Sequence, residues 1–162
     1  MKGRAALALA AMVLAAGCPK EAAKEAADEL IRAVLQRALV DAKDLADIGM
    51  LSEGPELIVQ TEIEASPVQI TPAALPEVPG RKLVLLKSSQ ILERARNVGD
   101  VYFVQINYLE LHGNEATMMV GVGIRSAPER RGLPMCCCTG EVRYALVEGK
   151  WVYRGSGGTV CP

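Results

Sequence analysis

The sequence is poor in the residues on which many catalytic and nucleic-acid-binding sites depend. Its 162 residues include one His, one Phe and one Trp. A Ser–His–acid or Cys–His site would have to use His112, which stands in a predicted turn. Nucleic-acid binding is also disfavoured, because aromatic side chains for stacking are scarce and no basic stripe is present. We therefore predict that the protein is not an enzyme and has no nucleic-acid partner.

Motifs for nucleotides and metals are missing as well. Gly121-Val122-Gly123 lacks the third glycine of a dinucleotide fingerprint, and its place in a strand pattern indicates close packing instead. Gly149-Lys150 lacks the upstream glycine of a P-loop. No Cys-x-x-Cys pair is present to build a zinc or copper site. These absences predict no cofactor and no metal.

The chain does have a leader. Lys2 and Arg4 precede an uninterrupted apolar run from Ala5 to Ala16. This run is too short for a stable transmembrane helix, and its arrangement is typical of a signal peptide. No later stretch is long and apolar enough to cross a bilayer. We expect residues 1–17 to be cleaved from the mature protein.

The end of this leader, Leu14-Ala15-Ala16-Gly17-Cys18, resembles the lipobox of bacterial lipoproteins, with its leucine one place further from the cysteine than is commonest. The resemblance implies that Cys18 is acylated and becomes the new N-terminus, which makes the lipid bilayer a partner. Several acyl chains hold a protein firmly, because each buried methylene contributes ~0.8 kcal/mol. Pro19 follows where an aspartate would signal inner-membrane retention, which favours the outer membrane, facing the periplasm.

A long amphipathic helix is predicted next. Residues 20–47 are dominated by good helix formers and contain neither Gly nor Pro. Apolar residues recur at spacings of three and four, which predicts one apolar stripe that packs on a sheet. The alanine-rich first turns are a candidate stalk from the lipid. We assign residues 18–50 to the anchor and helix, and residues 51–162 to the α+β domain that this helix completes.

The rest of the chain predicts strands and one short helix. Residues 57–63 and 83–86 are candidate strands, and residues 89–98 a helix. Between the strands, residues 66–80 contain four prolines and are predicted to be an extended linker or edge segment. From residue 101 onward, alternating β-branched and aromatic residues predict antiparallel strands. The expected class is α+β, with the long N-terminal helix packed on a curved antiparallel sheet.

The segments "GNEATMMVGV" and "ALVEGKWVYRG" support this class. They resemble the endings of NTF2-like and cystatin-like domains, where a hairpin strand after a Gly-Asn or Gly-Asp turn precedes a last strand with Gly-Lys-Trp. The resemblance covers about residues 83–154 and implies that fold. Some enzymes of the fold use an Asp–His pair inside a cone, and this sequence offers no such pair. Fold alone does not supply a function.

Four cysteines remain if Cys18 is acylated. Cys136, Cys137 and Cys138 are consecutive, and Cys161 follows a glycine-rich tail. Outside the cytoplasm an even number of cysteines usually forms disulfides, and three pairings are possible. A bridge from Cys161 to the triplet would hold a tail that is otherwise expected to be flexible. A vicinal redox pair and a metal site are the alternatives.

Together these patterns predict a membrane-anchored lipoprotein with a non-catalytic domain in the bacterial envelope. The domain is expected to bind another envelope protein or a small ligand. One alternative is a thiol redox or metal-handling lipoprotein that uses Cys136 to Cys138. Another is an NTF2-like enzyme whose site the sequence does not reveal.

Overall fold

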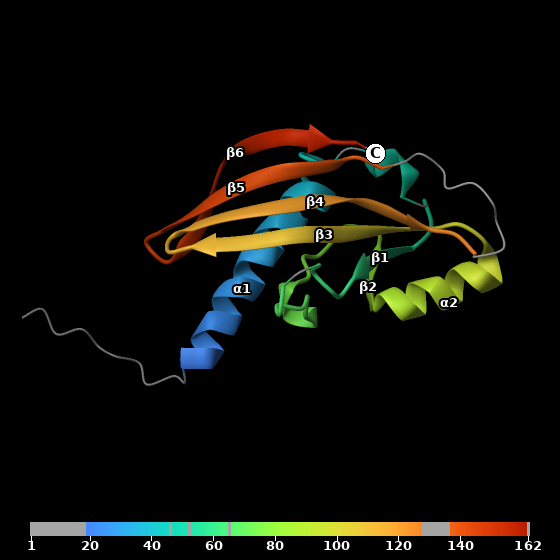
Figure 1. Ribbon diagram of the computed structural model, residues 1–162, viewed down its shortest axis with the longest axis horizontal. Coiled ribbons are helices and arrows are strands. Elements are labelled where there is room, and N and C mark those ends of the chain that lie inside the picture. Colours follow the sequence, from blue (N-terminus) through green and yellow to red (C-terminus); the bar gives the residue numbers. More distant parts are fainter. Residues whose placement is uncertain (1–18, 46, 52, 65, 128–136, 162) are drawn as a thin grey trace, which may run out of the picture.

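The computed structural model describes residues 19–45, 47–51, 53–64, 66–127 and 137–161. The leader and Cys18 lie outside this range. The described chain forms an α+β fold with a six-stranded sheet in the order β2-β1-β3-β4-β5-β6 (Figure 1). In the part of the chain that the structure describes, no helix is long and apolar enough to span a membrane.

The helical elements are α1 (Pro19–Leu35), one π-helical turn η1 (Gln36–Val40), the 3-10 turns η2 (Ile48–Met50) and η3 (Pro72–Ala74), and α2 (Ser88–Val98). The strands are β1 (Glu56–Gln60), β2 (Lys82–Leu86), β3 (Val101–His112), β4 (Glu115–Arg125), β5 (Thr139–Val147) and β6 (Lys150–Val160). Helix α2 and strands β2 to β6 lie where the sequence predicted them, within a few residues, except that β6 extends through the glycine-rich tail.

The predicted helix over residues 20–47 is too long. Helix α1 with η1 ends at Val40, and Ala42 and Asp44 then adopt left-handed backbone conformations with φ of 50° and 62°. No glycine or proline stops the helix there. The chain turns instead because side chains after the turn bind the sheet, as described for the functional site below.

The main core lies between α1 and one face of the sheet. The apolar stripe of α1 and η1 is buried there, at Leu30, Ile31, Val34, Leu35 and Ala38. On β4 the predicted alternation is confirmed, since its alternate residues Ala116, Met118, Val120 and Val122 are each no more than 2% exposed. Burying a large apolar side chain fully stabilises the fold by roughly 1.5–3 kcal/mol. The helix is therefore an integral layer of the domain.

Helix α2 covers the opposite face of the sheet. Its Ile91 and Ala95 pack with Val101 and Phe103 of β3 in a second, smaller core. In β3, Val104 belongs to the α1 core, and successive residues of a strand point to opposite faces. The two helices thus bury the two faces of the same strand.

The sheet is mixed, which corrects the prediction of an antiparallel sheet. Strands β3 to β6 are antiparallel, but β1 pairs in parallel with both β2 and β3. Parallel neighbours need a crossover connection that returns the chain to the same end of the sheet. The proline-rich segment provides this connection between the neighbours β1 and β2, and helix α2 connects β2 to β3, which lies on the other side of β1.

The proline-rich segment, predicted as an extended linker or edge over residues 66–80, packs on the helix. Ile70 and Ala74 are buried in the α1 core. Side-chain hydrogen bonds tie the segment to α1: Arg32 donates to the carbonyl of Ala73 through Nε and Nη2, and the Thr71 hydroxyl donates to Asp28 Oδ1 over 2.9 Å. This segment therefore forms one wall of the domain beside the first turns of α1.

Candidate functional site

The cysteines bring the two ends of the last hairpin together. Cys138, just before β5, forms a disulfide with Cys161, just after β6. Cys137 is buried and is also disulfide-bonded. Cys136 and Cys18 lie outside the described residues. Within those residues, no three His, Cys, Asp or Glu side chains gather in a way that could hold a metal ion.

The glycine-rich tail, expected to be flexible without a bridge, is the second half of β6. Gly155 pairs with Arg143 and Thr159 pairs with Gly140 across the β5–β6 ladder. The strand therefore has both backbone pairing and the disulfide to hold it in place.

An aspartate ties the turn after α1 to the thiol segment. The backbone N–H of Cys138 donates to Asp47 Oδ2 over 2.7 Å. Asp47 itself adopts a left-handed conformation with φ of 62°. Such a conformation is uncommon outside glycine and persists where surrounding contacts hold it. The hydrogen bond from Cys138 is one of these contacts.

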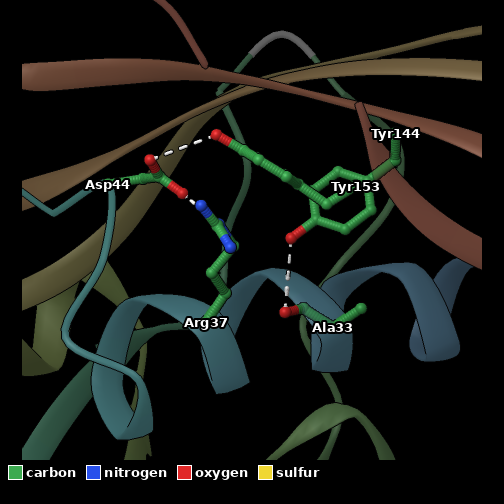
Figure 2. A network of polar contacts seen from close by, with 5 residues as sticks. All are labelled: Ala33, Arg37, Asp44, Tyr144 and Tyr153. Carbon is green, nitrogen blue, oxygen red and sulfur yellow. Dashed lines mark hydrogen bonds and ion pairs between the residues drawn. The ribbon is translucent and has the colours of Figure 1, made fainter. Parts of the chain in front are cut away.

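A polar and aromatic cluster joins the end of α1 to strands β5 and β6, and consists of Arg37, Asp44, Tyr144 and Tyr153 (Figure 2). Arg37 forms an ion pair with Asp44, and its guanidinium carbon lies 3.5 Å from the centre of the Tyr153 ring. The hydroxyl of Tyr153 donates to the second carboxylate oxygen of Asp44 over 3.3 Å. The hydrogen bond that Arg37 donates to Asp44 raises the pKa of Arg37, so the guanidinium stays charged.

Tyr144 is the buried member of this cluster. Its ring meets that of Tyr153 edge to face, with centroids 5.6 Å apart, and its hydroxyl donates to the carbonyl of Ala33 over 3.4 Å. Two residues before Tyr153, the indole N–H of Trp151 donates to the carbonyl of Ala26 over 3.0 Å. Tyr144 and Trp151 therefore have apolar bodies on the sheet and polar tips on the helix backbone.

The polar groups of this cluster bind one another and the helix. The guanidinium, the carboxylate and both hydroxyls are each engaged within the cluster or with helix backbone. Sequence reasoning did not identify these residues. One signal was available for the aromatic members. Tyr144 lies in one predicted strand, and Trp151 and Tyr153 stand two residues apart in the next, which places them on one face of the sheet. Arg37 and Asp44 gave no signal, because they were expected to lie on one continuous helix.

His112 lies at the far end of the sheet from the disulfide. It sits at the β3–β4 turn, where its Nε2 is 2.7 Å from Glu110 Oε1, and its side chain is 70% exposed. Glu110 also accepts a hydrogen bond from Tyr108. Both hydrogen bonds lower the pKa of Glu110, and the bond from Tyr108 has the larger effect. The structure therefore does not bring the single histidine together with the described cysteines.

Two grooves flank the first turns of α1. One has a volume of about 500 Å³ and is lined by residues of α1 and of the proline-rich segment, which are Ala23, Lys24, Ala27, Asp28, Pro67, Val68, Gln69 and Thr71. We call it the alanine groove. The other has a volume of about 260 Å³ and is lined mainly by charged side chains of α1, which include Glu21, Glu25, Glu29 and Arg32. Lys24 and Asp28 line both grooves, so the two hollows lie next to each other along the helix.

The burial of Tyr144 predicts a late ionisation. Burial raises the pKa of this phenol from 10.0 to about 12, so the folded protein holds the proton more tightly than the unfolded chain. The stability that this group contributes is complete below about pH 10 and is lost as the pH rises toward 12. We expect Tyr144→Phe to remove the last step from a phenolate absorbance titration. A last step that survives Tyr144→Phe would assign it to another tyrosine.

The aromatic cluster, the disulfide and the alanine groove are the features that a related protein would be expected to share. Comparison of this chain with protein-family models, with curated proteins and with solved structures finds no match.

Proposed function

We propose that the protein is exported and anchored in the bacterial envelope through acylated Cys18, and that its α+β domain has a non-catalytic binding role on the periplasmic side of the outer membrane. The observation that carries this proposal is the lipobox-like sequence that ends at Cys18. Its partner would be another envelope protein or a small ligand.

The disulfide supports an exported location. Disulfides persist in oxidising compartments such as the periplasm and are rare in the cytosol. The Cys138–Cys161 bond holds the terminal strand of the sheet. A disulfide that stabilises the fold agrees with the oxidising periplasm, to which the leader is expected to direct the protein.

The position of α1 supports a short connection to the membrane. The helix begins at Pro19, directly after Cys18, so the anchor and the domain are joined without an intervening loop. Its first turns are exposed and extend beyond the strands in Figure 1, and burial begins at Ala27. The indole of Trp151 on β6 meets the helix at Ala26, seven residues after Pro19, which is roughly 10 Å along the helix at 1.5 Å per residue.

The outer edge of the sheet supports a binding role. Strand β6 has a neighbour on one side only among the described strands, and its Val152 and Val160 are 41% and 60% exposed. The free backbone groups of an edge strand can pair with a strand of another protein. We also propose that β3 to β6, with α1 on one face, are a variant of the NTF2-like or cystatin-like arrangement, to which β1 and β2 add two parallel strands.

Replacing Cys18 with alanine tests the anchor. We expect wild-type protein to remain in the membrane pellet through a high-salt wash and to be released only by detergent, because several buried acyl chains hold it. The Cys18→Ala variant should move almost entirely into the soluble fraction. Intact-mass measurement of the detergent-extracted wild type should show cleavage before Cys18 and the added acyl mass.

Cys161→Ser is the matched control for this experiment. It also removes one sulfur, but it lies at the other end of the chain and should leave the protein in the membrane pellet. If Cys18→Ala stays in the washed pellet as firmly as Cys161→Ser does, Cys18 is not the anchor. An uncleaved wild-type protein without acyl mass would contradict the proposal independently.

A further inference from the structure

The sheet has a second free edge at β2, and backbone groups along it are unpaired. Among the described strands, β2 has β1 as its only neighbour. The backbone N–H of Lys82 donates to the carbonyl of Pro55 over 2.8 Å, so Lys82 and every second residue after it bond to β1. The N–H and C=O groups of Leu83 and Leu85 therefore point away from β1. No residue in the described part of the chain pairs with them.

The two edges of the sheet differ in regularity. The β5–β6 ladder has two register shifts, one between Gly140 and Val142 and one between Arg143 and Tyr144. Such irregularities twist an edge strand and hinder the addition of another strand. The β1–β2 ladder has no shift, and the four apolar residues 83–86 of β2 are each partly exposed. Strand β2 is therefore the more regular template for a further strand.

A hollow of about 530 Å³ lies beside the start of this edge. Its lining is formed by five apolar residues and two charged ones, which are Leu75, Pro76, Val78, Pro79 and Leu83, with Glu77 and Arg81. The side chain of Leu83 packs against the main core, on the α1 face of the sheet. A residue directly opposite Leu83 on an added strand would share that face and reach the hollow. The mostly apolar lining favours an apolar side chain there, since Glu77 and Arg81 carry opposite charges.

Basic side chains stand at both ends of β2. Lys82 begins the strand and Lys87 directly follows it, and both are exposed. Neither forms an ion pair with any described residue. Glu56 is opposite Lys82 in the ladder, but its carboxylate pairs with Arg94 over 3.4 Å. An added strand therefore gains from a carboxylate near each of its ends.

A second copy of this chain fits the edge poorly. Two β2 strands could pair antiparallel with Leu83 of each opposite Leu85 of the other, which would satisfy the free backbone groups of both. The same register brings Arg81 of each copy opposite Lys87 of the other. Like charges directly opposite each other destabilise a strand pair. The charges thus favour a different, acidic partner.

We propose that the free edge of β2 binds an extended segment of a partner protein, with an apolar residue opposite Leu83 and carboxylates near Lys82 and Lys87. Its main chain would pair with Leu83 and Leu85 and continue the sheet beyond β2. This inference rests on the binding role proposed above and gives that role a second edge and a partner chemistry. It does not depend on the acylation of Cys18.

Synthetic peptides test this edge in the full-length protein, purified in detergent. The probe is a fluorescein-labelled peptide with the sequence Glu-Thr-Val-Thr-Leu-Glu, whose binding is measured by fluorescence anisotropy. We expect it to bind at least about tenfold more tightly than Lys-Thr-Val-Thr-Leu-Lys, because its charges oppose those of the edge. N-methylation of its Val and Leu nitrogens should abolish binding, because these groups are needed for strand pairing.

Charge reversal on the protein locates the peptide. The double variant Lys82→Glu with Lys87→Glu should lose the acidic peptide and gain the basic one. Lys150→Glu is the matched control, because Lys150 is an exposed lysine of the other edge strand, β6. It should keep the wild-type preference.

Three results would overturn this inference. Binding that Lys150→Glu weakens and the double variant does not would assign the peptide to β6 and leave the binding role intact. A wild-type protein that binds neither peptide would show that β2 does not accept an added strand. A wild-type dimer that the double variant disrupts would assign the edge to a second copy. The membrane fractionation of Cys18→Ala tests the anchor separately, so these results leave the anchor unaffected.

Discussion

Replacing Phe103 with alanine is expected to lower the free energy of unfolding by about 3–5 kcal/mol. Phe103 is the only phenylalanine of the chain and is 2% exposed in the small core beneath α2. Its ring fits tightly, since a Cβ at Gly123 on the neighbouring strand would stand 2.6 Å from it. Alanine would leave a cavity that the surrounding Ile91 and Ala95 cannot fill. The midpoint of denaturant unfolding measures this loss, provided that the slope stays unchanged.

Two variants separate packing from general effects of substitution. Phe103→Leu keeps most of the buried volume and should cost less than Phe103→Ala. Val98→Ala, at the end of α2 and 68% exposed, should change the stability by less than about 0.5 kcal/mol. If Phe103→Ala unfolds at the same denaturant concentration as Val98→Ala, the α2 core does not contribute as the structure implies.

Replacing Cys161 with serine is expected to cost about 3 kcal/mol. The Cys138–Cys161 bond spans 23 residues, and closing a loop of this size restricts the unfolded chain by roughly that amount in the chain-entropy model. The variant should also allow the last residues of β6 to fray, because that strand lies at the edge of the sheet. A lower melting temperature and faster amide hydrogen exchange at residues 155–160 would report the two effects.

The neighbouring Val160→Ser is the control for Cys161→Ser. Val160 is 60% exposed, so its replacement introduces a serine in the same strand end while the disulfide stays intact. The double variant Cys138→Ser with Cys161→Ser should match the single variant, since both lack the same bond. Equal melting temperatures for Cys161→Ser and Val160→Ser would show that the disulfide does not stabilise the fold.

The sequence predicted those elements whose signal is local. The alternation on β4 and the apolar face of α2 depend on side chains within one segment, and the structure has both. A serine cap, Ser88 or Ser89, was also expected for α2, but the N-cap is Lys87, whose backbone N–H donates to the side chain of Gln90. Gly121 was expected to mark close packing, and a Cβ there would stand 2.9 Å from the carbonyl oxygen of Cys138. Each of these features follows from the spacing or the size of neighbouring residues.

The features that the sequence did not predict are set by distant contacts. The sequence of a short apolar strand such as β1 does not indicate which strands it pairs with. Its parallel pairing with β2 and β3 could therefore not be predicted from residues 56–60. The end of α1 depends on Arg37 and Asp44 meeting Tyr153, which lies more than one hundred residues away in the chain. Helix propensity alone favours continuation through this region.

The position of β1 between β2 and β3 also sets an order for folding. Strands β3 and β4 are joined by a two-residue turn, as are β5 and β6, so each hairpin can close with little loss of chain entropy. Strand β1 instead pairs with β2, which follows the proline-rich segment, and with β3, which follows α2, so its contacts are distant in the chain. Contacts between distant parts of a chain form more slowly than local ones. We expect the hairpins to assemble early and to serve as the template on which β1 and β2 are added last.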